Sequence, residues 1–471
     1  MIFVLVRLPW LWAGYGAETD SYRIALSALH LWRDGEYLPS RLPGYPVHEL
    51  LMAPLVLLGG SVATNLATAL ASLAGVLIFA AIVKRAGARP PGLLVIALAF
   101  TPFLLVNSVQ TKDYLWALTF LLAAYLATIE DHPLVSGVLL GLGAGCRVTT
   151  GLFALPLLLL YVDRRAWRDA LVFVTALAVT AFVVFLPVTL QFGSHFFAYA
   201  NSSISPDIII GSIGQYSIGA FGAIATLTAL ALSWRRVLHL PAAAKIEVHV
   251  RIWLATVALY SLLFLRLPID LGYLIPIYPF GYLLLGRVLR PYLLTAVVAV
   301  ILVSGMIDLD ISAMHNFNMR TFARTARPCR SCAELFHDLH VRHLYVSYAS
   351  ELGVVPLPSH TVVLTGAIFP DFAVLNWSRF RYHVIDRYGD SISMLSDDGA
   401  MSDDAHDVLY LASPDRPDVV DRLRGQGYRV IKSDPIGPDW HVGFTPPLPT
   451  EKLEVCCNER AGRKVGARAN G

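Results

Sequence analysis

The sequence has few charged residues and few cysteines. Of its 471 residues, 15% are charged and 56% are hydrophobic. Long stretches therefore have no polar face to expose to water, which excludes an ordinary soluble globular protein and indicates a polytopic α-helical membrane protein. The five cysteines are too few and too unevenly placed to form a disulfide framework. The formal net charge of +3 is close to neutral for this length and gives no indication of nucleic-acid binding.

Residues 1–307 form the predicted membrane domain. Apolar runs alternate there with short polar links and predict about 11 transmembrane segments. Residues 1–16 are interpreted as the first pass, because no small-residue cleavage site follows them. The run 133–162 is interrupted at 143–147, so it makes two short passes or a re-entrant hairpin. The other expected passes are 61–83, 92–109, 114–129, 169–190, 211–233, 251–265, 273–286 and 291–306.

Basic residues indicate the orientation of these passes. Four links that lie on the same side carry most of the membrane domain's Lys and Arg residues, and positive links face the cytoplasm. These links contain Arg85, Arg165, Arg236 and Arg287. The first outer loop, 17–47, and the C-terminal region then face outward. We therefore expect an integral protein of the cell (inner) membrane whose acidic loop and C-terminal domain are extracytoplasmic.

The composition changes near residue 308. Short β-rich runs alternate with amphipathic stretches over 308–450 and predict a small α/β domain. The expected strands include 343–348, 361–364, 407–411 and 428–431, and the expected helices include 332–340 and 417–424. The basic tail, 451–471, has a composition typical of disorder.

Ionisable residues at a membrane are functional candidates, because burying a charge there is costly unless it has a partner or a task. Asp20, Asp113, Arg147 and Asp270 come from separate segments but are all expected at the outer side. Simpler roles exist for each of them. The first two could be helix N-terminal acids, Arg147 could extend to the interface, and Asp270 could form a surface ion pair with Arg266.

An ordered set of motifs surrounds these residues. Asp20-Ser-Tyr22 and Gly35-Glu-Tyr37 precede Ser40-Arg-Leu-Pro-Gly-Tyr-Pro46, and these are followed by Thr111-Lys-Asp113-Tyr, a glycine-rich stretch that ends at Arg147, and Asp270-x-x-Tyr273-Leu-x-Pro276. Together they resemble the GT-C class of membrane glycosyltransferases, the superfamily of the protein O-mannosyltransferases and the lipid A aminoarabinose transferase. The chain departs from the pattern at Ser21, where a second acid is frequent, and at Gly272, where a basic residue is frequent.

The resemblance implies transfer of a sugar from a polyprenyl-phosphate donor to an acceptor hydroxyl on the outer face, with inversion. Such a displacement needs a base for the acceptor and positive charge for the departing phosphate. Asp20 is the expected base, and Asp113 would position the acceptor or a cation. The residues expected to bind the donor phosphate are Arg147, Lys112 and Arg41, and those expected to bind substrate are Glu18, Tyr22, Tyr45, Asp270 and Tyr273.

The resemblance leaves the sugar and the acceptor open. The acceptor could be a lipid, a protein or a glycan, and membrane lipids are expected partners. No cofactor is certain: a divalent cation between Asp20 and Asp113 is conceivable, but no ligand spacing requires it. Cys329 and Cys332 with the nearby histidines have zinc-like spacing, yet a local disulfide or an incidental pair is favoured in an oxidising compartment.

Two other classes share this predicted topology. A transporter or lipid flippase would also have outward charges, but the sequence contains no duplicated half and no second broken helix to match 143–147. A plain membrane anchor for a C-terminal binding module would not require charges in several separate segments. The transferase is the favoured hypothesis.

Overall fold

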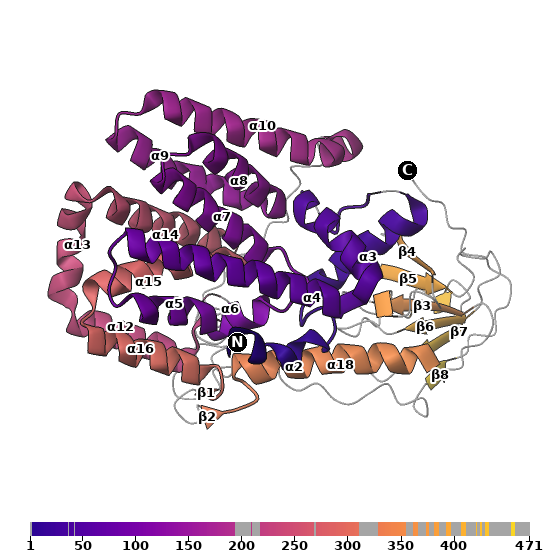
Figure 1. Ribbon diagram of the computed structural model, residues 1–471. Coiled ribbons are helices and arrows are strands. Elements are labelled where there is room, and N and C mark those ends of the chain that lie inside the picture. Colours follow the sequence, from indigo (N-terminus) through magenta and orange to yellow (C-terminus); the bar gives the residue numbers. More distant parts are fainter. Residues whose placement is uncertain are drawn as a thin grey trace.

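The computed structural model describes residues 2–35, 37–41, 43–193, 209, 217–267, 270–309 and 328–354, and short stretches of the C-terminal region that include six strands. Figure 1 shows a bundle of helices with six strands, β3 to β8, gathered at one end of the molecule. Four helical stretches are long and apolar enough to cross a membrane: Pro46–Arg85, Trp167–Phe192, Val248–Arg266 and Leu271–Val288. The described part is thus a mostly helical membrane protein, as predicted.

The N-terminal segment differs from the prediction. Residues 1–16 were expected to form a single pass, but they contain two short helices, α1 (Ile2–Leu5) and α2 (Leu8–Leu11). The buried Arg7 lies between them and donates hydrogen bonds to Ser108 Oγ and to the carbonyl of Ala99, at 2.7 Å for the latter. Pro9, at the start of α2, has no N–H for a continuous helix. The segment is therefore folded against the bundle.

Helix α3 (Thr19–Asp34) follows in the first loop and ends at Gly35, which adopts a left-handed conformation. The long helix α4 (Pro46–Arg85) comes next, and its backbone leaves helical geometry at Gly59 and Gly60. This kink lies just before residue 61, where the expected pass begins. Beyond α4 lie α5 (Pro91–Phe100), α6 (Pro102–Asn107) and α7 (Tyr114–Ile129).

The predicted break in the run 133–162 is present. Helix α8 (Pro133–Cys146) ends at Arg147, whose backbone is extended, and the chain continues as the 3₁₀ helix η1 (Val148–Phe153) and α9 (Ala154–Asp163). The glycines of α8 explain its packing against α10 (Trp167–Phe192). A Cβ atom at Gly137 would lie 2.4 Å from the carbonyl oxygen of Phe173. Only glycine lets the two backbones approach this closely.

The remaining helices complete the bundle. They are α12 (Ala220–Leu232), α13 (Trp234–Ile246), α14 (Val248–Arg266), the 3₁₀ turn η4 (Leu271–Leu274), α15 (Ile277–Val288) and α16 (Pro291–Ser304). Their apolar side chains form a core with α5, α7 and α9. Asp308, just after α16, accepts hydrogen bonds from the amides of Ala220 and Phe221 and so caps the start of α12.

The C-terminal region begins with a helix where a strand was expected. Residues 343–348 alternate like a strand but lie within α18 (Glu334–Val354). The buried positions 338, 341, 342, 345 and 349 recur every three or four residues, which is the helical period. The structure thus contradicts the strand prediction for 343–348, and the helix expected at 332–340 is the first part of α18. In Figure 1, α18 runs from the bundle towards the strands.

Six strands form a mixed sheet in the order β4-β5-β3-β6-β7-β8. They are β3 (Thr361–Thr365), β4 (Arg381–Ile385), β5 (Ile392–Ser396), β6 (Asp407–Tyr410), β7 (Arg429–Lys432) and β8 (Glu454–Cys456). β3, β6 and β7 are parallel, with Val362 opposite Val408. Three strands were therefore predicted correctly. β8 lies within the tail expected to be disordered, and most of the helix expected at 417–424 lies outside the described residues.

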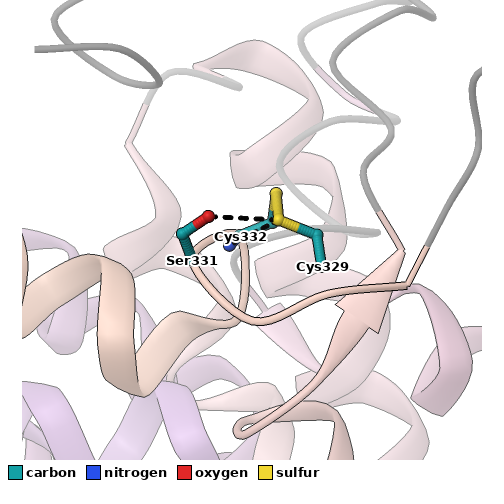
Figure 2. Close-up of a disulfide and its surroundings, with 3 residues drawn as sticks. All are labelled: Cys329, Ser331 and Cys332. Atoms are coloured by element: carbon teal, nitrogen blue, oxygen red, sulfur yellow. Dashed lines mark hydrogen bonds between the residues drawn. A yellow bond between two sulfur atoms is a disulfide. The ribbon is translucent and has the colours of Figure 1, made fainter.

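Cys329 and Cys332, for which the sequence left a local disulfide and an incidental pair open, form a disulfide with 5.4 Å between their Cα atoms. Figure 2 shows the pair at the end of β2 (Pro328–Cys329), which pairs antiparallel with β1 (Asp308–Leu309). The disulfide closes the turn just before α18 begins.

Candidate active site

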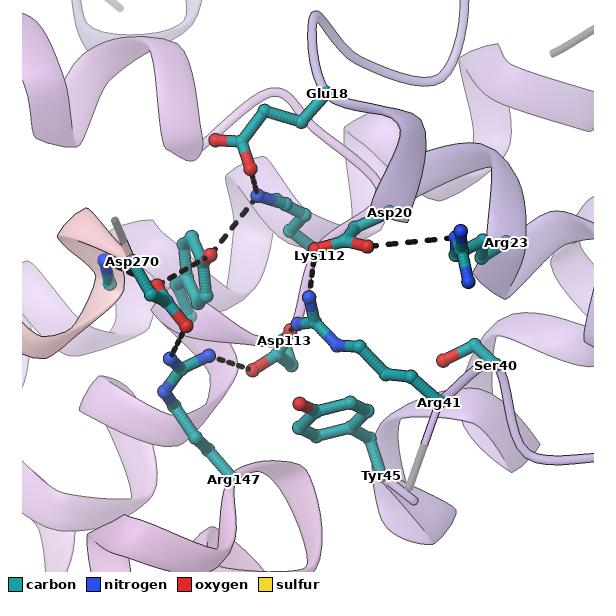
Figure 3. Close-up of polar contacts among 12 residues, drawn as sticks. Glu18, Asp20, Arg23, Ser40, Arg41, Tyr45, Lys112, Asp113, Arg147 and Asp270 are labelled. Carbon is teal, nitrogen blue, oxygen red and sulfur yellow. Dashed lines mark hydrogen bonds and ion pairs between the residues drawn. The ribbon is translucent and has the colours of Figure 1, made fainter. Parts of the chain in front are cut away.

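Five segments that are distant in sequence meet at one polar cluster. They are the start of α3, the loop before α4, the link 108–113 between α6 and α7, the break after α8, and the start of η4. Figure 3 shows their charged side chains pointing towards one another. Nine of the predicted site residues lie in or beside this cluster: Glu18, Asp20, Arg41, Tyr45, Lys112, Asp113, Arg147, Asp270 and Tyr273.

Arg147 joins two of these segments. One of its terminal nitrogens lies 3.1 Å from Asp113 Oδ2, and the other pairs with Asp270 Oδ2. The guanidinium also lies over the ring of Tyr273, at 4.8 Å from the centroid. For Asp270 the sequence slightly favoured a surface ion pair with Arg266 over a role in the site. In the structure Asp270 lies against Arg147 and accepts a hydrogen bond from the amide of Gly272.

Arg41 brings the loop before α4 into the cluster. Its Nη1 pairs with Asp20, and its Nη2 lies 3.5 Å from Asp113 Oδ1. Tyr45 lies under the guanidinium with its ring centroid 4.7 Å away. Arg23, one turn after Asp20 on α3, is 3.9 Å from the other carboxylate oxygen of Asp20.

Lys112 is fully buried beside the two arginines. Its ammonium donates to Glu18 and, at 3.1 Å, to the hydroxyl of Tyr114. The Tyr114 hydroxyl in turn donates to Asp270 Oδ1 at 3.1 Å. The rings of Tyr114 and Tyr273 both lie against the Arg147 guanidinium. Aromatic faces as well as carboxylates therefore stabilise this cation.

Tyr114 also accounts for the departure at Gly272. A Cβ atom at Gly272 would lie 2.6 Å from Cε1 of the Tyr114 ring. A basic side chain at this position would displace the ring from Lys112 and Arg147.

Positive and negative charges are balanced in this cluster. Four carboxylates face three cations, with Arg23 at the edge. Burial opposes the charge on Asp270, but Arg147, Arg41 and Lys112 lower its pKa well below the usual range. Burial lowers the pKa of Lys112, and Glu18 partly offsets that effect.

Two buried guanidinium donors of this cluster have no hydrogen-bond partner among the described residues. They are Nη2 of Arg41, which lies 3.5 Å from the likewise unbonded Oδ1 of Asp113, and Nε of Arg147. Buried donors usually find an acceptor. Arg147 also borders a small cavity of about 10 Å³ together with Tyr114, Tyr260 and Tyr273. The cluster therefore has donors that an anionic group could engage, although the cavity itself has room for about one water molecule.

Two residues of this region were missed from the sequence. Tyr114 directly follows the quoted Asp113, and that adjacency was the available signal. Glu49, in the first turn of α4, accepts hydrogen bonds from Tyr37, Ser40 and the amide of Tyr45, and so holds the loop that carries Arg41. An acid at the start of an apolar helix should have drawn attention to it.

Tyr22, in contrast, lies away from the cluster. It is fully buried and packs edge-on against Tyr15 and Tyr345, with centroids 5.4 Å and 6.2 Å away. Asp113, although it precedes α7, makes no side-chain capping bond to that helix and contacts the two arginines instead. Among the described residues, no three His, Cys, Asp or Glu side chains converge as metal ligands would.

Comparisons with known proteins bear on this arrangement. A model of Glycosyltransferase family 87 matches residues 45–268. Two crystal structures of ArnT from Cupriavidus metallidurans, one bound to undecaprenyl phosphate and one in the apo state, have a similar fold. For each, the sequence identity is 14%, the TM-score is 0.54 and the alignment covers 92% of both chains. No curated protein sequence matches the chain. The family match and the shared fold confirm the resemblance to the GT-C class of membrane glycosyltransferases.

Proposed function

We propose that this protein, which has the fold of the GT-C class of membrane glycosyltransferases, transfers a hexosyl or pentosyl group from a polyprenyl-phosphate donor to an acceptor hydroxyl at the outer face of the membrane. The observation that carries the proposal is the cluster of Arg41, Lys112 and Arg147, in which Nη2 of Arg41 and Nε of Arg147 are buried without a hydrogen-bond partner among the described residues. The undecaprenyl phosphate in the ArnT crystal structure is a ligand of the proposed donor class.

The phosphate of the donor would bind between the arginines. Guanidinium groups suit this task because they can donate two parallel hydrogen bonds to phosphate oxygens. Arg147 offers its partnerless Nε, and Arg41 offers Nη2. Lys112 adds a point charge from the link 108–113. Asp113, fully buried between both guanidinium groups, then orients them and does not bind the acceptor.

Asp20 is the proposed base. It is about one quarter exposed, with 26% of its side chain accessible, whereas Asp113 is fully buried. In the ligand-free protein Asp20 is paired with Arg41. An arriving phosphate competes for Arg41 and so releases Asp20 when donor is bound.

The transfer step is a single displacement. The acceptor oxygen bonds to the anomeric carbon from the face opposite the phosphate, and its proton passes to Asp20. The bond between the anomeric carbon and the phosphate oxygen breaks, and its electron pair remains on the phosphate. The departing phosphate gains negative charge, and Arg147, Arg41 and Lys112 stabilise that charge.

The prenyl chain needs an apolar surface next to the phosphate. An apolar cavity of about 220 Å³ lies between α12, α15 and α16, lined by side chains that include Leu274, Ile277, Leu285 and Ile301. Leu274 belongs to η4, directly after Tyr273 of the cluster. This cavity is the proposed path for the lipid chain.

The test is a transfer assay in membranes that contain the wild-type protein or the Asp20→Asn variant. Radiolabelled polyprenyl-phosphate sugars serve as donors, and label is followed into lipid, protein and glycan fractions. We expect transfer by the wild type and loss of transfer in Asp20→Asn with donor binding retained. Asp131→Asn, at an exposed link, is the matched control and should transfer normally.

The labelled fraction would identify the acceptor class. Undiminished transfer by Asp20→Asn would remove Asp20 from the mechanism. If the wild type transfers sugar from none of the donors, the transferase proposal fails and lipid flipping becomes the better hypothesis.

A further inference from the structure

Helix α18 of the C-terminal region packs directly against the segment that carries two site residues. Leu335 and Leu339 of α18 contact an apolar cluster that includes Leu105, Val106 and Val109 at the end of α6. The amide of Leu335 also donates to the carbonyl of Gly305. The helix thus lies on the outer end of the bundle, beside the link 108–113.

Arg342 binds the backbone of that segment. Its Nη1 donates to the carbonyl of Val109 at 2.7 Å and its Nη2 to the carbonyl of Val106 at 3.2 Å. The Val106 carbonyl is in the last turn of α6 and also accepts the amide of Val109 at 3.3 Å, and the Val109 carbonyl lies just beyond the helix, where the helix dipole favours a cation. Arg342 is fully buried, so the two bonds are shielded from water.

Asp338 completes the contact one turn earlier on α18. It pairs with Arg342 Nε at 2.8 Å and accepts a hydrogen bond from Gln110 Nε2 at 2.9 Å. Asp338 and Gln110 are both buried. A buried ion pair of this kind is strongly destabilised when one partner is removed, which makes its geometry well defined.

Gln110, which donates to Asp338, lies two residues before Lys112 and three before Asp113. Thr111, between them, donates its amide to the carbonyl of Tyr15 at 2.8 Å. The link is therefore fixed on one side by Tyr15 and on the other by Asp338 and Arg342. Because the link is short, a shift at Gln110 is transmitted to both site residues.

We propose that Asp338 and Arg342 are positioning residues, through which α18 sets the location of Lys112 and Asp113 in the cluster. The C-terminal region is then a structural part of the site as well as a separate domain. Its effect on catalysis rests on the proposed sugar transfer, whereas its effect on the position of Lys112 does not.

The first measurement concerns Lys112 alone. The full-length protein in detergent is treated with acetic anhydride, and acetylation of Lys112 is followed by mass spectrometry. Lys112 is inaccessible in the wild type. In Arg342→Met we expect Lys112 to be acetylated at least about tenfold faster than in the wild type, because opening of the link exposes the amine. Gln110→Ala, a milder change, should show a smaller increase if Arg342→Met fails to fold.

Two controls separate positioning from loss of stability. His343→Ala changes an exposed neighbour of Arg342 on α18 and should leave acetylation of Lys112 unchanged. Phe173→Leu removes buried packing in α10, remote from the link, and should lower the thermal stability without exposing Lys112. Equal acetylation in Arg342→Met and Phe173→Leu at matched stability would overturn the proposal.

The second measurement is the split between kcat and KM. A purely structural loss lowers the amount of active enzyme and hence the apparent kcat, with the donor KM unchanged. Misplacement of Lys112 should instead raise the donor KM by about tenfold in Arg342→Met. Arg342→Lys keeps the charge beside Asp338 but cannot bind both carbonyls, so an intermediate KM is expected. Exposure of Lys112 in a protein that transfers no sugar would uphold this inference and reject the proposed function.

Discussion

Arg147 and Asp113 are 34 residues apart in the sequence, and their side chains lie 3.1 Å apart where the break after α8 meets the start of α7. Asp113 is fully buried and also lies against Arg41, so one carboxylate orients both guanidinium groups. This arrangement needs the break at Arg147: a continuous helix would carry the side chain past the link 108–113. The interruption of an apolar run is therefore what places the cation in the site.

The contacts of Arg147 predict that lysine cannot replace it. A single ammonium cannot reach Asp113 and Asp270 together in the way that the two terminal nitrogens of a guanidinium do. We expect kcat/KM for sugar transfer to fall by about 100-fold in Arg147→Lys, the scale found when one preorganised donor is lost. Arg164→Lys, at an exposed link, is the matched control. Transfer by Arg147→Lys within a factor of about two of the control would contradict this role.

The pair of Lys112 and Glu18 predicts a shift in pH dependence. Burial lowers the pKa of Lys112 below its usual 10.5, and the negative charge of Glu18 raises it again in part. Phosphate binding requires the charged amine, so donor affinity is present below this pKa and is lost as the pH rises through it. The alkaline loss should therefore begin at lower pH than for an ordinary lysine.

Removal of Glu18 should move the alkaline loss of donor affinity to still lower pH. In Glu18→Gln the pKa of Lys112 falls, and the pH at which the donor KM begins to rise should fall with it. Lys112→Arg should move the alkaline rise of the donor KM to higher pH, because arginine stays charged. The measurement is the donor KM between about pH 6 and about pH 10, with Glu130→Gln at an exposed link as control. If the donor KM rises at the same alkaline pH in all variants, a group other than Lys112 controls this rise.

The sequence predicted those features that depend on local chemistry. The glycines and the arginine at 143–147 identified the break, and the separated charges identified most members of the cluster. The strand expected at 343–348 was wrong because a half-buried helix and a strand can share the same short alternation, and only the packing of α18 on α6 selects the helix. Tyr114 and Glu49 were missed because their roles depend on which segments meet, which a single sequence does not specify.

Glu49 lies outside the charged cluster, but its substitution is expected to weaken donor binding. Its carboxylate is the common acceptor for Tyr37, Ser40 and the amide of Tyr45, on both sides of Arg41. Glu49→Ala leaves these donors without an acceptor, at a cost of about 1–3 kcal/mol for each that stays buried. We expect the donor KM to rise by about tenfold as Arg41 loses its fixed position. Ser40→Ala, which retains the Ser40 amide, should have a smaller effect, and equal effects would reject this explanation.

The glycines of α8 predict a loss of stability that a second substitution offsets. A Cβ atom at Gly141 would lie 2.6 Å from Cβ of Thr180 on α10, so Gly141→Val should separate the two helices and destabilise the protein by about 1–3 kcal/mol. Gly92, in the first turn of α5, has no neighbouring atom within 4 Å of its added Cβ, and Gly92→Ala should leave the thermal midpoint unchanged or slightly higher. Thermal unfolding of the purified protein in detergent measures both.

The double variant Gly141→Ala with Thr180→Gly tests the cause. If the contact between these two positions produces the loss, the removal of the Thr180 side chain makes room for the new methyl group, and the double variant should be more stable than Gly141→Ala alone. Additive losses in the two single variants would instead indicate that each residue acts on its own helix. Because α8 ends at Arg147, an altered distance between α8 and α10 should also lower kcat/KM for sugar transfer in proportion to the shift of the thermal midpoint.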